Sequence, residues 1–99
     1  MNKEELRFLR DCLVQSTLDD YESLETLAPE IASWAAEENQ PYSFESLVDV
    51  LRGLMEEGVV HTFRFSQDLG KFVHADFDAD AIQELWFLAN REQIGLDTK

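Results

Sequence analysis

The spacing of apolar residues changes from a helical period to a strand period at Gly58. Before this glycine, apolar side chains recur every three or four residues, as they do along an amphipathic helix. Directly after it, β-branched and aromatic residues dominate. Because glycine adopts a positive φ without strain, Gly58 suits the end of a helix. A chain of 99 residues with this switch predicts one domain, 1–99, in which helices precede a small β-hairpin.

The sequence predicts a mostly α-helical protein with a small β-hairpin. Before Gly58, helices are expected over residues 3–15, 20–38 and 44–57. Pro29 predicts a kink or a split in the second of these, because proline lacks the N–H donor and clashes with the preceding turn. Ser43 is a good N-cap for the third helix, which carries the clearest apolar stripe.

After Gly58 the pattern predicts a hairpin with strands over 59–65 and 71–75, followed by a helix over 79–91. A register that pairs His61 with His74 places Arg64 opposite Lys71. The last helix is expected to be apolar around most of its circumference, and such a helix must be buried on more than one side.

The charge balance is strongly acidic. Twenty-one Asp and Glu face eight Lys and Arg, so the net charge is −13 and the pI is about 4.2. The single cysteine, Cys12, cannot form an internal disulfide, which favours a reducing compartment such as the cytoplasm. We expect neither a secretory leader nor a membrane span, since charged residues interrupt every long apolar stretch.

Two segments resemble the winged helix-turn-helix superfamily. They are Leu-Arg-Gly-Leu-Met-Glu-Glu-Gly-Val-Val at 51–60, where a helix feeds directly into a strand, and Gly-Lys-Phe-Val at 70–73, which looks like the returning wing strand. The resemblance covers residues 20–75. It implies that the flanking helices 3–15 and 79–91 serve dimerisation, as in many such proteins, and that 44–57 occupies the place of a recognition helix.

DNA binding is one function that this resemblance implies. The residues that would contact base edges are Ser46, Asp49 and Arg52, and those that would contact phosphate are Arg64 and Lys71. The expected recognition helix has a net charge of −3, however, and phosphate binding requires cations at several points. A DNA-binding transcriptional regulator is therefore the alternative and not the preferred function.

Metal and calcium sites are not expected. The acidic segment 76–80 resembles the start of a calcium loop, but Ala81 and Phe87 stand where that loop needs glycine and glutamate. His61 and His74 could hold a metal across the hairpin, yet zinc sites normally need a third or fourth protein ligand. A partly buried cluster of these histidines with the phenylalanines on the same strand face is the simpler interpretation; these are Phe63, Phe65 and Phe72.

The preferred function is that of a small acidic regulatory or adaptor module, which acts by protein–protein contact and dimerises. Its anchors are expected in the last helix, at Trp86, Phe87 and Leu88. The acidic surface over 19–38 would repel nucleic acid and steer basic partners. An acidic decoy of a DNA-binding protein is a further alternative. Because no nucleophile, base or metal cluster appears with usable spacing in the sequence, we expect no enzyme, no cofactor and no small-molecule substrate.

Overall fold

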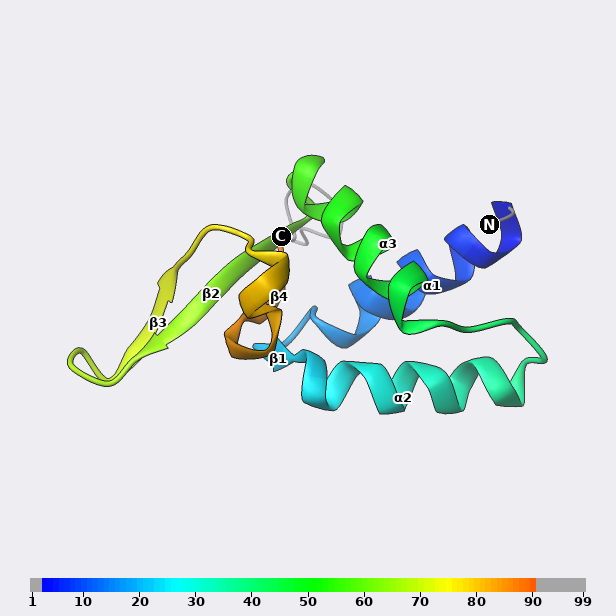
Figure 1. The fold of residues 1–99 in the computed structure, drawn as a ribbon, viewed down its shortest axis with the longest axis horizontal. Coiled ribbons are helices and arrows are strands. Elements are labelled where there is room, and N and C mark those ends of the chain that lie inside the picture. Colours follow the sequence, from blue (N-terminus) through cyan, green and yellow to red (C-terminus); the bar gives the residue numbers. More distant parts are fainter. Residues whose placement is uncertain (1–2, 91–99) are drawn as a thin grey trace, which may run out of the picture.

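Over residues 3–90, which are those that the computed structural model describes, three α-helices cover one face of an antiparallel sheet (Figure 1). The helices are α1 (Lys3–Ser16), α2 (Leu24–Glu37) and α3 (Phe44–Glu56). The strands are β1 (Glu22–Ser23), β2 (Val60–Ser66), β3 (Lys71–His74) and β4 (Trp86–Ala89), and the short 3-10 helix η1 (Ala79–Glu84) leads into β4. The protein is therefore a mixed α/β structure.

The last strand in sequence lies inside the sheet. The strand order is β1-β4-β2-β3, and every neighbouring pair is antiparallel. Trp86 of β4 faces Ser23 of β1 on one side and Phe63 of β2 on the other. β4 thus joins the short strand before α2 to the hairpin that follows α3.

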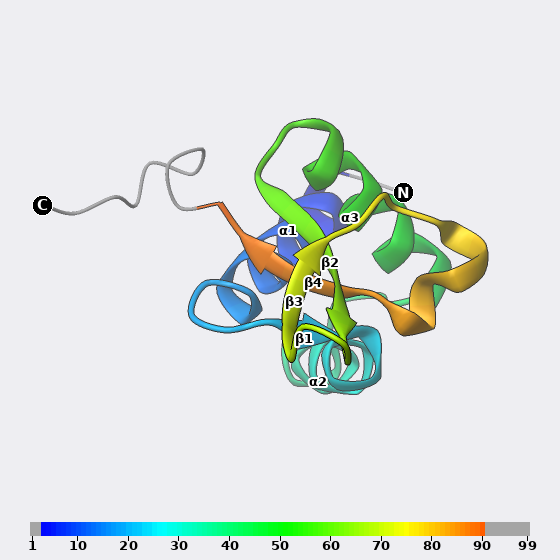
Figure 2. The ribbon, with the colours of Figure 1, turned by 90° about the vertical axis from the view of Figure 1, so that its left-hand side faces the viewer.

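Side chains alternate between the two faces of the sheet because successive strand residues point in opposite directions. The inner face, which the helices cover, takes its buried side chains from alternate positions: Val60, Thr62, Phe87 and Ala89. The outer face receives the positions between them, which include His61, Phe63, Trp86 and Leu88. Figure 2 shows the sheet in front of the helices from this outer side.

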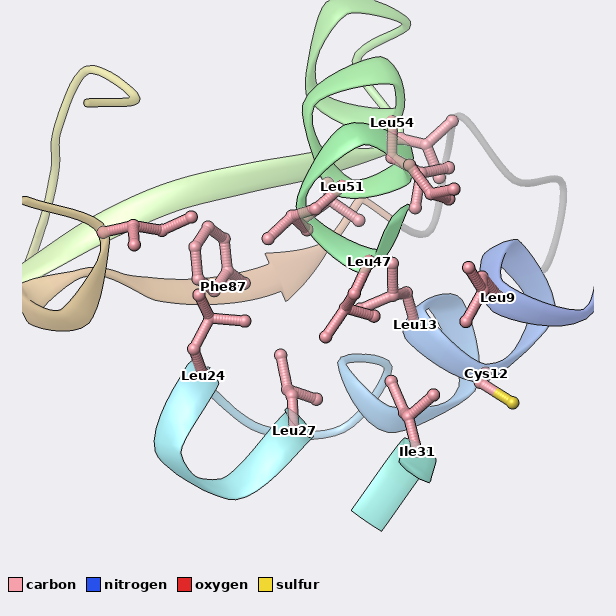
Figure 3. Close-up of a cluster of buried hydrophobic side chains, with 14 of the residues drawn as sticks. Leu9, Cys12, Leu13, Leu24, Leu27, Ile31, Leu47, Leu51, Leu54 and Phe87 are labelled. Carbon is pink, nitrogen blue, oxygen red and sulfur yellow. The ribbon is translucent and has the colours of Figure 1, made fainter. Parts of the chain in front are cut away.

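One hydrophobic cluster connects the helices with the sheet. It contains leucines from all three α-helices, and Phe87 joins them from β4 with 0% of its surface exposed. Figure 3 shows this ring among side chains such as Leu24, Leu27 and Leu51. Burial of an aromatic ring of this size is one of the largest single contributions that a small core can receive.

The expected helices over 3–15 and 44–57 are confirmed within one or two residues. At the start of α3, the backbone N–H of Ser46 donates to Oγ of Ser43 over 3.1 Å, which satisfies one of the free donors of the first turn. Gly58 follows the end of α3 with φ of 79°, the left-handed conformation that its position at the switch predicts.

The second helix differs from the expectation at its start and at Pro29. It begins at Leu24, because Glu22 and Ser23 pair with β4 as a strand. It then continues without a split through Pro29, which lies in its second turn and leaves only the carbonyl of Glu25 without its helical donor. The buried stripe along the helix outweighs this lost bond; its members are Leu24, Leu27, Ile31 and Ala35.

The helix expected over 79–91 is wrong. Residues 79–84 form the 3-10 helix, Leu85 is extended with φ of −97° and ψ of 152°, and β4 follows; residue 91 lies outside the described residues. A short apolar run fits a buried strand as well as a buried helix. The strand forms here because two neighbours, β1 and β2, satisfy its backbone groups, and alternate side chains enter the core.

The hairpin forms where it was expected, but with another register. His74 faces Phe63 instead of His61, and Arg64 faces Val73 instead of Lys71. The expected register would place Gly70 inside the ladder, whereas it lies in the turn with φ of 65° and its N–H donates to the Ser66 carbonyl over 2.7 Å. The shift is two residues, so each side chain keeps its face of the sheet.

Replacing the central aromatic side chain tests this account of the core. We expect Phe87→Ala to lower the free energy of unfolding by about 3–5 kcal/mol, since it removes a fully buried ring. The matched variant Phe44→Ala removes a ring that is 41% exposed, and we expect a loss below about 1 kcal/mol. Urea denaturation followed by circular dichroism measures both values. Similar losses in the two variants would contradict the burial of β4 between its neighbours.

Candidate functional site

The outer face of the sheet carries a cluster of aromatic side chains, which we call the aromatic face. Its members are Tyr21, His61, Phe63, Phe65, Phe72, His74 and Trp86. They come from alternate positions of β2, β3 and β4, and from the residue that precedes β1. No other element of the described residues 3–90 lies over this side of the sheet in Figure 2.

The rings of the aromatic face hold one another in place. Tyr21 stacks on Phe72 with centroids 4.0 Å apart, and it meets Phe63 edge-on at 4.9 Å. Phe72 also contacts Trp86 at 5.1 Å and Phe65 at 5.3 Å. Each such pair contributes about 0.5–1.5 kcal/mol beyond simple burial. The surface is therefore ordered before any ligand binds.

Among the phenylalanines of the aromatic face, exposure increases toward the tip of the hairpin, whereas His61 and His74 are both exposed. Phe63 is buried by its neighbours, and the rings of Tyr21, Phe72 and Trp86 are half-buried. Beyond them Phe65 is 50% exposed, and Leu69 in the turn is 63% exposed. β4 pairs with β2 only as far as Phe63, so the rest of the hairpin projects from the body as an arm (Figure 1).

This face lacks the acidic side chains that dominate the chain. None of its positions in the described strands, nor Tyr21 beside them, is an Asp or Glu, although the whole chain has a charge of −13. The members that can carry a positive charge are the two histidines, His61 and His74. An apolar surface without carboxylates is a surface that another protein can cover at low desolvation cost.

The histidines are neighbours, as the sequence suggests, but diagonal ones. Their ring centroids lie 5.6 Å apart with the planes at 89°, and the ring of His74 also lies 4.6 Å from that of Phe63. Within residues 3–90, no three His, Cys, Asp or Glu side chains gather as metal ligands would. The grouping of these histidines with Phe63, Phe65 and Phe72 on one face is confirmed.

The residues expected as interface anchors separate onto the two faces. Trp86 and Leu88 lie on the outer face and are half-buried. Phe87 lies on the inner face in the core, so it is not an anchor; along a strand, adjacent side chains cannot share a face. The sequence did not indicate the role of Tyr21, because only the pairing of β1 with β4 brings it beside Phe63.

The residues expected to contact DNA lie on α3 and on the hairpin, and several already have partners in the protein. The hydroxyl of Ser46 lies 2.8 Å from that of Ser43, and the Arg52 guanidinium lies 5.5 Å from the ring centre of Phe77. Nη1 of Arg64 donates to Glu84 over 3.0 Å. Asp49 and Lys71 are exposed, on α3 and at the start of β3.

A second feature is a groove between α1 and the end of α2. Cys12 lies at its base and is only 8% exposed. Burial raises the pKa of this thiol from an ordinary 9.0 to about 11, and the carboxylates of Asp11, Glu30 and Glu38 add to the shift. A thiol that stays protonated at neutral pH is not a nucleophile, so the residue serves packing.

Comparison of the chain with protein families, with curated proteins and with solved structures gave no match. Among the helices of residues 3–90, none has the length and apolar character that crossing a bilayer requires.

The pKa of Cys12 can be tested by its reactivity. At pH 8 we expect iodoacetamide to alkylate the native protein at least about 100-fold more slowly than the urea-unfolded protein, because a thiol with a pKa near 11 supplies far less thiolate. Mass spectrometry of timed samples measures both rates. The raised pKa also means that the unfolded thiol ionises first, so this group's contribution to stability is complete below pH 9 and is lost as the pH rises toward 11. Equal rates in the folded and unfolded chains would contradict this placement of Cys12.

Proposed function

We propose that this protein is a small acidic interaction module that dimerises through its aromatic face and has no catalytic activity. The observation that carries the proposal is the ordered cluster of rings on the side of the sheet that no helix of residues 3–90 covers. Apolar side chains of this size are rarely left in water over a continuous surface unless they meet a partner.

The charge distribution favours a second copy as the partner. Two chains of charge −13 repel one another, so they can associate only where their carboxylates are few. The aromatic face is such a place, since its described positions carry no carboxylate. Two identical apolar faces related by a two-fold axis also complement each other without any second type of surface.

The geometry of the sheet suits this arrangement. Two sheets pack face to face at about 10 Å, with interdigitating side chains between them. In such a dimer the helices of each copy form the outer layers, and the aromatic rings form a shared inner layer. The projecting arm with Phe65 and Leu69 enlarges the contact, which for a stable pair needs about 800 Å² from each partner.

DNA binding within a winged-helix fold remains the second candidate. The order of three helices followed by a hairpin agrees with that resemblance. Arg64 and Lys71 also occupy the same side of the hairpin, opposite the aromatic face. The pairing of Arg64 with Glu84 and the acidic side chains of α3 weaken this candidate; they are Glu45, Asp49 and Glu56.

A charge placed on the aromatic face should separate the dimer. We expect Phe65→Glu to raise the dissociation constant at least about 100-fold, since each copy would bury an unpaired carboxylate in the interface. Phe44→Glu is the matched control, because it replaces a ring on α3 of similar exposure, 41% against 50%, with the same change in net charge. Sedimentation velocity over a concentration series measures both, and circular dichroism checks that each variant folds. A wild-type protein that stays monomeric at about 1 mM, or a Phe65→Glu variant that dimerises normally, would refute the proposal.

The two candidates differ in their response to DNA. In fluorescence anisotropy at low salt, we expect no binding of a random-sequence duplex at protein concentrations up to about 100 µM, since the surface is rich in carboxylates. Binding that weakens steeply with salt and disappears in the variant Arg64→Ala/Lys71→Ala would favour the DNA-binding candidate instead.

A further inference from the structure

The groove between α1 and α2 combines an apolar floor with an acidic edge, and we call it the acidic groove. It has a volume of about 360 Å³. Its floor is formed by Phe8, Cys12 and Trp34, and its edge by Asp11, Gln15, Glu37 and Glu38. The rings of Phe8 and Trp34 are half-buried, while the carboxylates are exposed to solvent.

The helical period explains how these residues meet. Phe8, Asp11, Cys12 and Gln15 follow one another at intervals of three, one and three residues, so they share one side of α1. Trp34 and Glu37 are three residues apart near the end of α2, and Glu38 caps that helix. Figure 3 shows Cys12 at the border of the core, beyond Leu9 and Ile31.

The acidic groove has a local excess of negative charge. No Lys or Arg occurs from residue 11 to residue 51, and none of the described residues 3–90 that line the groove is basic. The nearest arginine in sequence, Arg10, donates instead to both carboxylate oxygens of Glu57, each over 3.1 Å. Neither α1 nor α2 has a basic residue in its last turn.

The position of two of these carboxylates is unfavourable by itself. Glu37 and Glu38 lie at the C-terminal end of α2, where the helix dipole is negative and favours cations. Asp11 and Glu38 also contribute to the raised pKa of Cys12 at the base of the groove. This contribution arises from the same negative potential. A bound cation would relieve this repulsion.

We propose that the acidic groove binds a basic amphipathic segment of a partner protein. An apolar side chain of that segment contacts Phe8 and Trp34, and an adjacent Lys or Arg lies among the carboxylates of Asp11, Glu37 and Glu38. The Trp34 ring adds a cation–π contact for a guanidinium or ammonium group. The volume lies at the lower end of the range for ligand sites, which suits a few side chains better than a large cofactor.

The charge complementarity selects this occupant. Among the described residues that line the groove, a nucleic acid or an anionic membrane would meet three carboxylates and no cation. A second copy of this chain is a poor match, because its charge is also −13 and the groove, unlike the aromatic face, is lined by carboxylates. The acidic groove lies at the end of the molecule opposite the hairpin arm (Figure 1), so this proposal is independent of dimerisation through the aromatic face.

An NMR titration of the intact protein tests the proposal. The probe is a helical peptide of about 18 residues that contains leucine on one face and lysine on the other. We expect the indole N–H signal of Trp34, assigned with Trp34→Phe, to shift in a saturable manner, while that of Trp86 on the aromatic face stays in place. A peptide with glutamine in place of each lysine should bind at least about 10-fold more weakly.

Two charge variants separate the acidic groove from general attraction to an acidic protein. We expect Glu37→Gln/Glu38→Gln to weaken binding of the lysine peptide about 10-fold. Glu45→Gln/Asp49→Asn removes the same number of charges from α3, and we expect it to change the affinity less than about twofold. Equal losses in the two variants, a shift of Trp86 in place of Trp34, or equal binding of the glutamine peptide would each overturn the proposal.

Discussion

The insertion of β4 between β1 and β2 is the constraint on which the rest of the structure depends. This strand forms backbone hydrogen bonds with partners on both sides. Its residue Phe87 packs in the hydrophobic core against side chains of the helices, which connects the sheet to them. Without it, β1 would be two residues without a neighbour, and the hairpin would have no connection to the start of α2. The strand also positions Trp86 beside Phe63, which completes the outer cluster of rings.

A sheet with helices on one face divides the protein into two chemically different sides. The three α-helices carry nine of the carboxylates, whereas the opposite face of the sheet presents rings and histidines. This separation allows two kinds of contact in one small chain. The aromatic face suits an identical apolar surface, and the acidic groove at the far end suits a basic segment.

Sequence periodicity predicted the helices and strands that are specified by residues close to them in the chain. The helix after Ser43 follows from a cap, a stripe and Gly58, which all act locally. The hairpin follows from the turn chemistry around Gly70, although its register depends on where that glycine can adopt a positive φ. The run from Leu85 to Ala89 carried no such local signal, because its apolar residues fit either a helix or a strand.

The sequence by itself determined the three α-helices before Gly58, the position of the hairpin, the acidic balance and the placement of the phenylalanines on one strand face. Each of these depends on neighbours within a few residues or on composition. The tertiary structure decided that residues 86–89 form a strand, that Tyr21 belongs to the aromatic face, and that Phe8 and Trp34 share a groove. These contacts join segments far apart in sequence, and their free energy comes from pairing and burial that arise only when the chain is folded.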